Sequence, residues 1–99
     1  MKLKEKIICS DLYEAKKLGS LIFNKDGKEM FVTGILDVVE NEIILSLKDK
    51  SAHSVLLKDE EQAEKFADFI QSIIEKHHKL NSAKIIDNVV EITKSEKLH

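Results

Sequence analysis

Five side chains of this 99-residue sequence could bind a soft metal ion, namely those of Cys9, His53, His77, His78 and His99. Zinc sites are built on short paired spacings of cysteine or histidine, and no such pair occurs here. His77 and His78 are adjacent, and adjacent side chains on a helix point about 100° apart, so the two do not converge on one ion. The sequence therefore predicts no metal site and no cofactor.

Catalysis would need a nucleophile or an acid–base pair, and the candidates are Cys9, Asp37 and His53. No base or glycine motif surrounds Cys9, which indicates a buried structural thiol. Asp37 interrupts an apolar strand pattern, so it is either a general acid or base or an exposed charge that discourages aggregation of the sheet. Walker and GxGxxG loops are absent from the sequence. We therefore predict a non-catalytic protein, with Asp37 and His53 as the first residues to test for an activity.

Composition narrows the range of partners. All 16 basic residues are lysine, the net charge is −2, and the sequence lacks arginine, tryptophan and proline. Arginine is the residue best suited to bidentate recognition of phosphates and guanine edges, so its absence argues against nucleic-acid binding. The alternative rests on seven lysines in the first third of the chain: Lys2, Lys4, Lys6, Lys16, Lys17, Lys25 and Lys28. The preference for lysine and isoleucine also fits a low-GC bacterial or phage origin.

An acidic run comprises Asp59, Glu60, Glu61, Glu64 and Asp68. Acidic side chains stabilise the start of a helix, and such a run is commonly a solvated helix face. The other interpretation is a surface that docks on a basic partner.

A helix over 59–80 is the element around which the other segments are expected to pack. Apolar residues recur at three- and four-residue spacing, Asp59 can cap the N-terminus, and basic residues lie at the C-terminus. The repeating residues are Ala63, Phe66, Ala67, Ile70, Ile73, Ile74 and His77, with Phe69 beside them. A helix of this kind must bury its apolar face on another element.

The segments before this helix predict an antiparallel β-meander of about four strands, at roughly 21–25, 28–40, 42–47 and 52–57. Asp26 and Gly27 can form the first hairpin turn, and Gly34 indicates a bulge in the second strand. That second strand is apolar on both faces and is expected to be central. A short helix is predicted at 11–18, ended by Gly19, and residues 2–9 favour a strand.

The segment 84–93 stays ambiguous, because its apolar residues fit a helical stripe while six of its ten residues are β-branched and suit a strand. Residues 94–99 are expected to be loose. A meander followed by a helix resembles the PH-like architecture in element order, without a shared motif.

These observations predict one small α+β domain over 1–99, with the 59–80 helix packed on one face of the sheet. A single cysteine and the absence of a long apolar segment indicate a cytoplasmic protein with no membrane span. The function expected is that of a protein–protein interaction module, regulatory, adaptor or inhibitory, and a homodimer. The alternative is a domain that binds a hydrophobic small molecule or lipid.

Overall fold

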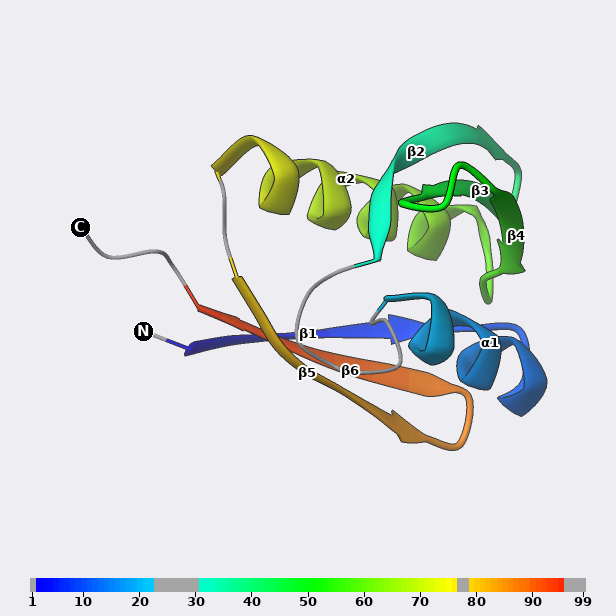
Figure 1. Ribbon diagram of the computed structural model, residues 1–99. Helices are drawn as coiled ribbons and strands as arrows, with labels where there is room; N and C mark the ends of the chain where they lie inside the picture. Colours follow the sequence, from blue (N-terminus) through cyan, green and yellow to red (C-terminus); the bar gives the residue numbers. More distant parts are fainter. Residues whose placement is uncertain (1, 23–30, 77–78, 96–99) are drawn as a thin grey trace.

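A computed structural model describes residues 2–22, 31–76 and 79–95, which form two α-helices and six β-strands (Figure 1). None of these helices is long and apolar enough to cross a membrane. In chain order, the elements are β1 (Lys2–Ile8), α1 (Leu12–Ile22), β2 (Val32–Val39), β3 (Glu42–Leu47), β4 (Ala52–Leu56), α2 (Glu60–Lys76), β5 (Lys79–Ile86) and β6 (Val89–Ser95).

The strands form two separate antiparallel sheets of three strands, ordered β1–β6–β5 and β2–β3–β4. The predicted α+β class, with a helix packed on a sheet, is confirmed. The described strands number six, against about four predicted for the meander. The strand expected at 2–9 and the two strands of the C-terminal segment together form the sheet β1–β6–β5. The hairpin β5–β6 follows α2, so the element order departs from the PH-like one.

The sheet β2–β3–β4 is the predicted meander. Strand β3 has the predicted bounds of 42–47, while β2 is shorter than the predicted 28–40, of which 28–30 lie outside the described residues. Register shifts on either side of Gly34 confirm an irregularity at that residue. The prediction that the second strand is central is wrong, because β3 lies between β2 and β4.

The sheet β1–β6–β5 pairs the first and last of the described strands, with Lys2 opposite Ser95. The ambiguous segment 84–93 forms most of the β5–β6 hairpin, and its helical alternative is wrong. A two-residue turn at Asp87 and Asn88 separates the strands, with Asp87 at a φ of 54°. Residues Lys94 and Ser95, expected to be loose, belong to β6, while 96–99 lie outside the described residues.

Helix α1 begins where predicted, since the Glu14 amide donates to Asp11 Oδ1 over 2.8 Å. It continues through Gly19, which was expected to end it, and the helix includes Leu21 and Ile22, which were predicted to begin a strand. A Cβ at Gly19 would lie 2.8 Å from Ile85 Cδ1. Glycine therefore lets α1 lie close to β5, despite the roughly 1 kcal/mol it costs inside a helix. The other parts of the predicted hairpin, residues 23–25 and the Asp26–Gly27 turn, lie outside the described residues.

Helix α2 begins at the predicted cap, where the Gln62 amide donates to Asp59 Oδ1 over 2.9 Å. It ends at Lys76, earlier than the predicted residue 80, because Leu80 belongs to β5. The buried residues of its apolar face are Ala63, Phe66, Phe69, Ile70 and Ile73.

One hydrophobic core joins both sheets and both helices. Helix α2 contacts β1, β2 and β3, and the β2–β3–β4 sheet curls around one end of it, while α1 contacts β4, β5 and β6 (Figure 1). Cys9 lies at the junction of the sheets, because it forms a bridge with Leu57 and its amide donates to the Asn88 carbonyl over 2.7 Å. The two sheets are therefore parts of one packed unit.

Candidate functional site

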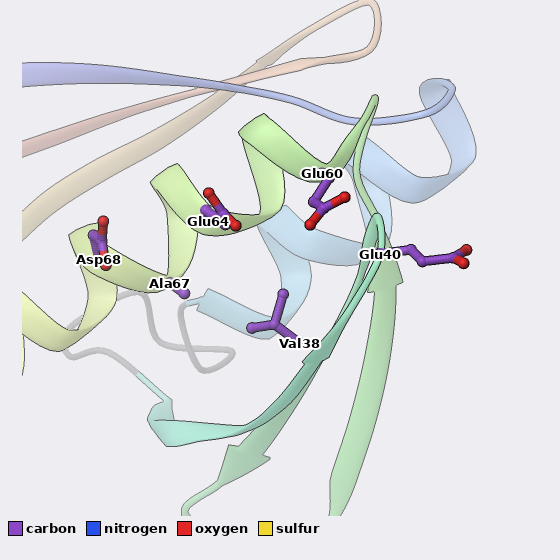
Figure 2. A pocket seen from close by; sticks show the side chains of 6 residues that line it. All are labelled: Val38, Glu40, Glu60, Glu64, Ala67 and Asp68. Atoms are coloured by element: carbon purple, nitrogen blue, oxygen red, sulfur yellow. The ribbon is translucent and has the colours of Figure 1, made fainter.

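A hollow of about 380 Å³ lies between α2 and β2, and we refer to it as the acidic groove (Figure 2). Four carboxylates and two small or medium apolar side chains line it. These residues are Glu40, Glu60, Glu64, Asp68, Val38 and Ala67.

The sequence around the groove explains how its walls form. Glu60, Glu64 and Asp68 are spaced four residues apart on α2, so they share one face of the helix. Val38 extends from β2 toward that face, while Glu40 lies at the end of the strand with its side chain extending outward (Figure 2). Glu40 has a φ of 55°, which is uncommon for a residue other than glycine and belongs to the turn into β3.

Ion pairing among the described residues does not extend to the acidic groove. None of its four carboxylates forms an ion pair with a lysine in the described part of the chain. The nearest lysine along the helix, Lys65, pairs instead with Glu5 at 3.4 Å and donates to the Lys6 carbonyl. Like charges four residues apart on a helix repel by a few tenths of a kcal/mol, so a bound cation would relieve a cost present in the free protein.

A second hollow, of about 500 Å³, also borders α2, shares Asp68 with the acidic groove and differs from it in charge. Its acidic residues are accompanied by Lys65 and Lys94, and the Lys94 ammonium lies 5.0 Å from the centre of the Phe69 ring. The lysines of this hollow therefore already contact groups of the same chain, which makes the acidic groove the better candidate for an external cationic partner.

Within residues 2–22, 31–76 and 79–95, no group of three or more His, Cys, Asp or Glu side chains is arranged to hold a metal ion. Of the candidate ligands, His77, His78 and His99 lie outside the described residues. Multiple carboxylates distributed along a helix suit an extended cationic partner, such as a peptide with several lysines.

Cys9 is fully buried, and the environment of its thiol opposes ionisation. Burial raises its pKa to about 12, with smaller contributions from the negative charges of Glu14 and Asp11. A thiol that stays protonated at neutral pH is a poor nucleophile, in keeping with the structural role expected from the sequence.

Asp37 and His53 are both exposed, and the strand register places them on opposite faces of the same sheet. Asp37 lies opposite Ile44, whereas His53 lies opposite the buried Leu45. The Asp37 carboxylate accepts a hydrogen bond from the Val38 amide over 2.9 Å. The two residues named as the first to test for an activity therefore do not share one site.

Sequence reasoning identified three of the groove carboxylates as part of an acidic run but missed the rest of the lining. Glu40 and Val38 belong to the groove because β2 packs against α2. Packing of the helix on the sheet was predicted, but not which residues at the end of β2 would face it. The role of Glu14 was also missed. This residue is buried, its Oε1 accepts a hydrogen bond from the Leu56 amide over 2.8 Å, and it forms an ion pair with Lys17 at 3.3 Å. Its position three residues after the Asp11 cap gave no sign that it would reach another sheet.

Comparison of the chain with known protein families, with curated proteins and with solved structures gives no match.

Proposed function

We propose that this protein is a non-catalytic interaction module that binds a cationic segment of a partner protein in the acidic groove. The observation that carries the proposal is the group of four acidic residues lining the groove, three of them on one face of α2 and none of them paired with a described lysine. Charge complementarity at such a surface speeds association and favours one class of partner over others.

The lining also indicates the form of the partner. Val38 and Ala67 supply apolar surface between the carboxylates. A short amphipathic segment with lysine or arginine at its margins and one apolar side chain at its centre would contact both kinds of lining. Regulatory, adaptor and inhibitory proteins commonly act by capturing segments of this type.

A single charge reversal tests the proposal. The probe is a lysine-rich amphipathic peptide, with Glu64→Lys as the variant and Glu75→Lys as a matched control on the same helix but outside the groove. Glu64→Lys is expected to weaken peptide binding about tenfold or more, since it replaces attraction by repulsion. Titration calorimetry at two salt concentrations would measure the effect.

The control variant separates an effect of the groove from an effect of net charge. Glu75→Lys changes the net charge equally, so it is expected to alter binding much less. Equal losses in the two variants, or binding of the unmodified protein that does not weaken with added salt, would contradict the groove as the binding site.

We also propose that the protein forms a homodimer. The support is the exposure of large apolar side chains at several strand positions, including Leu36, Val39 and Ile86. Light scattering over a range of protein concentrations measures the assembly state.

Binding of a hydrophobic small molecule or lipid is the alternative function. Both hollows described above are lined by charged side chains, which favours a charged partner over an apolar ligand. A thermal shift with lipid vesicles, or a ligand seen by native mass spectrometry, would favour the alternative.

A further inference from the structure

The two outer strands of the sheet β1–β6–β5 differ in how their free edges are covered. Along β1, the Ile8 amide donates to Gln62 Oε1 and the Ile8 carbonyl accepts from the Lys58 amide, over 3.0 and 2.9 Å. The Lys6 carbonyl accepts from Lys65 Nζ over 3.1 Å. The start of α2 and the residues before it therefore cap the β1 edge.

These bonds also define which groups of β5 point outward. Because Ile8 uses its amide and carbonyl on the side away from β6, its partner Val89 directs its own groups toward β5. Val89 then bonds Ile86 across the two-residue turn. Alternation along the strand leaves the amide and carbonyl of Ile85 pointing away from the sheet.

No described residue bonds these outward groups of Ile85. Helix α1 contacts both β5 and β6, and Gly19 packs on the Ile85 side chain, so within the described residues α1 lies over the sheet rather than along its edge. The side chains of Ile85 and Ile86 are 38% and 48% exposed, on opposite faces of the sheet. An edge with unpaired backbone groups and apolar side chains on both faces is a template for another strand.

We propose that this edge pairs with the same edge of a second copy of the chain, antiparallel and with the two-fold axis at Ile85. The two Ile85 residues would then exchange amide–carbonyl bonds, and the two sheets would form one of six strands. The inference rests on the proposal that the protein works through its surfaces, and it gives the proposed homodimer a location.

The charge of Lys84 and the irregularity near Asn81 favour a two-fold axis at Ile85 over axes at the neighbouring residues. A two-fold axis at Lys84 would place Lys84 opposite its own copy, and like charges directly opposite are destabilising. An axis at Ala83 would bring Ile85 to the irregularity between Leu80 and Ser82. The axis at Ile85 places Lys84 opposite Ile86, where the aliphatic stem of the lysine can cover the isoleucine.

The test uses paired substitutions on the outer face of the sheet. Ile86→Lys would oppose Lys84 of the second copy twice, whereas Ile86→Glu would form two cross-strand ion pairs. Ile8→Lys is the matched control, because the register places Ile8, Val89 and Ile86 in one row and Ile8 lies at the opposite edge.

Sedimentation equilibrium between roughly 10 μM and 1 mM suits the weak dimer expected from so short an edge. We expect Ile86→Lys to be monomeric across this range, while Ile8→Lys and the unmodified protein dimerise and Ile86→Glu dimerises at least as well as the unmodified protein. An unmodified protein that stays monomeric, or an Ile86→Lys variant that still dimerises, would overturn the proposal.

Amide hydrogen exchange of the unmodified protein gives a second test that does not depend on any variant folding. The Ile85 amide is expected to gain protection as the protein concentration rises, while the Lys84 amide, which faces β6, is protected throughout. Exchange at Ile85 that is independent of concentration would refute the edge pairing. Peptide binding in the acidic groove is measured separately, so either proposal can fail without the other.

Discussion

The two sheets have the same size and pairing direction but are assembled from the chain in different ways. Strands β2, β3 and β4 follow one another through short turns, so each pairs with its neighbour in sequence. In the other sheet, β1 pairs with β6 from the opposite end of the chain. The first sheet can form locally, whereas the second must close a loop that includes nearly the whole chain.

The difference shows why one shared core matters. A three-stranded sheet formed over a long loop needs contacts beyond its own ladders, and α2 provides them by contacting strands of both sheets. We expect the two sheets to unfold together despite their different origins.

Phe66→Ala is expected to have the largest effect on the joint unfolding of the two sheets, because Phe66 is fully buried on α2. Loss of a buried phenylalanine side chain is expected to lower the free energy of unfolding by about 3–5 kcal/mol. Urea unfolding measures the change, and amide exchange in β3 and β6 shows whether both sheets lose protection equally. Leu36→Ala, at an exposed position of β2, is the control and should change stability by less than about 0.5 kcal/mol. Loss of protection in one sheet alone would show that the sheets are independent.

Cys9 probes the junction between the sheets. Because burial raises its pKa to about 12 from the ordinary value of 9.0, alkylation by iodoacetamide near pH 8 should be at least about a thousandfold slower than in the denatured chain. Rates measured by mass spectrometry with and without denaturant test this expectation. Comparable rates in both states would place the thiol in an open junction.

The raised pKa of the Cys9 thiol also makes the stability of the fold depend on pH. The folded protein retains the thiol proton where the unfolded chain loses it, so this contribution to stability is complete below about pH 9 and is lost as the pH rises toward 12. Replacing the thiol by Cys9→Ala should flatten the alkaline part of the stability profile.

Substitutions of Glu14 are expected to change stability less than Phe66→Ala does. They test the connection between the sheets, because Glu14 on α1, which packs on β5 and β6, bonds to β4 of the other sheet. Glu14→Ala leaves the Leu56 amide without its acceptor, at an expected cost of about 1–3 kcal/mol. Glu14→Gln keeps an acceptor and loses the attraction to Lys17, so it should cost less. Urea unfolding at neutral pH compares the two variants, and equal costs would mean that the ion pair, rather than the amide bond, dominates.

The parts of the fold that the sequence predicted are those with local causes. Strand β3 alternates cleanly, Asp59 caps α2 as expected, α1 begins where predicted with Asp11 as its cap, and Gly34 lies at an irregularity of β2. Gly19 was misinterpreted, because its reason for being glycine is the approach of Ile85 from the far end of the chain. Strands β5 and β6 were ambiguous for a similar reason: β6 pairs with β1 from the other end of the described chain, and a helical and a strand pattern fit equally well until that pairing is known.

One wall of the acidic groove could be predicted from the sequence. The spacing of Glu60, Glu64 and Asp68 on one helix face follows from the sequence, whereas the opposing wall depends on packing of β2 against α2. The β5 edge could not be anticipated, since which strand edge is capped depends on Gln62, 54 positions from Ile8, and on Lys58 reaching Ile8 from another part of the chain.

The order β1–β6–β5 has a consequence for synthesis, because its middle strand is synthesised after both outer strands. At ordinary rates of translation, β1 waits roughly ten seconds for the strand that pairs with it. A nascent chain that stalls before Val89 has the two outer strands with nothing between them. Unfinished copies would thus expose bare strands to chaperones and proteases, which can distinguish them from completed ones.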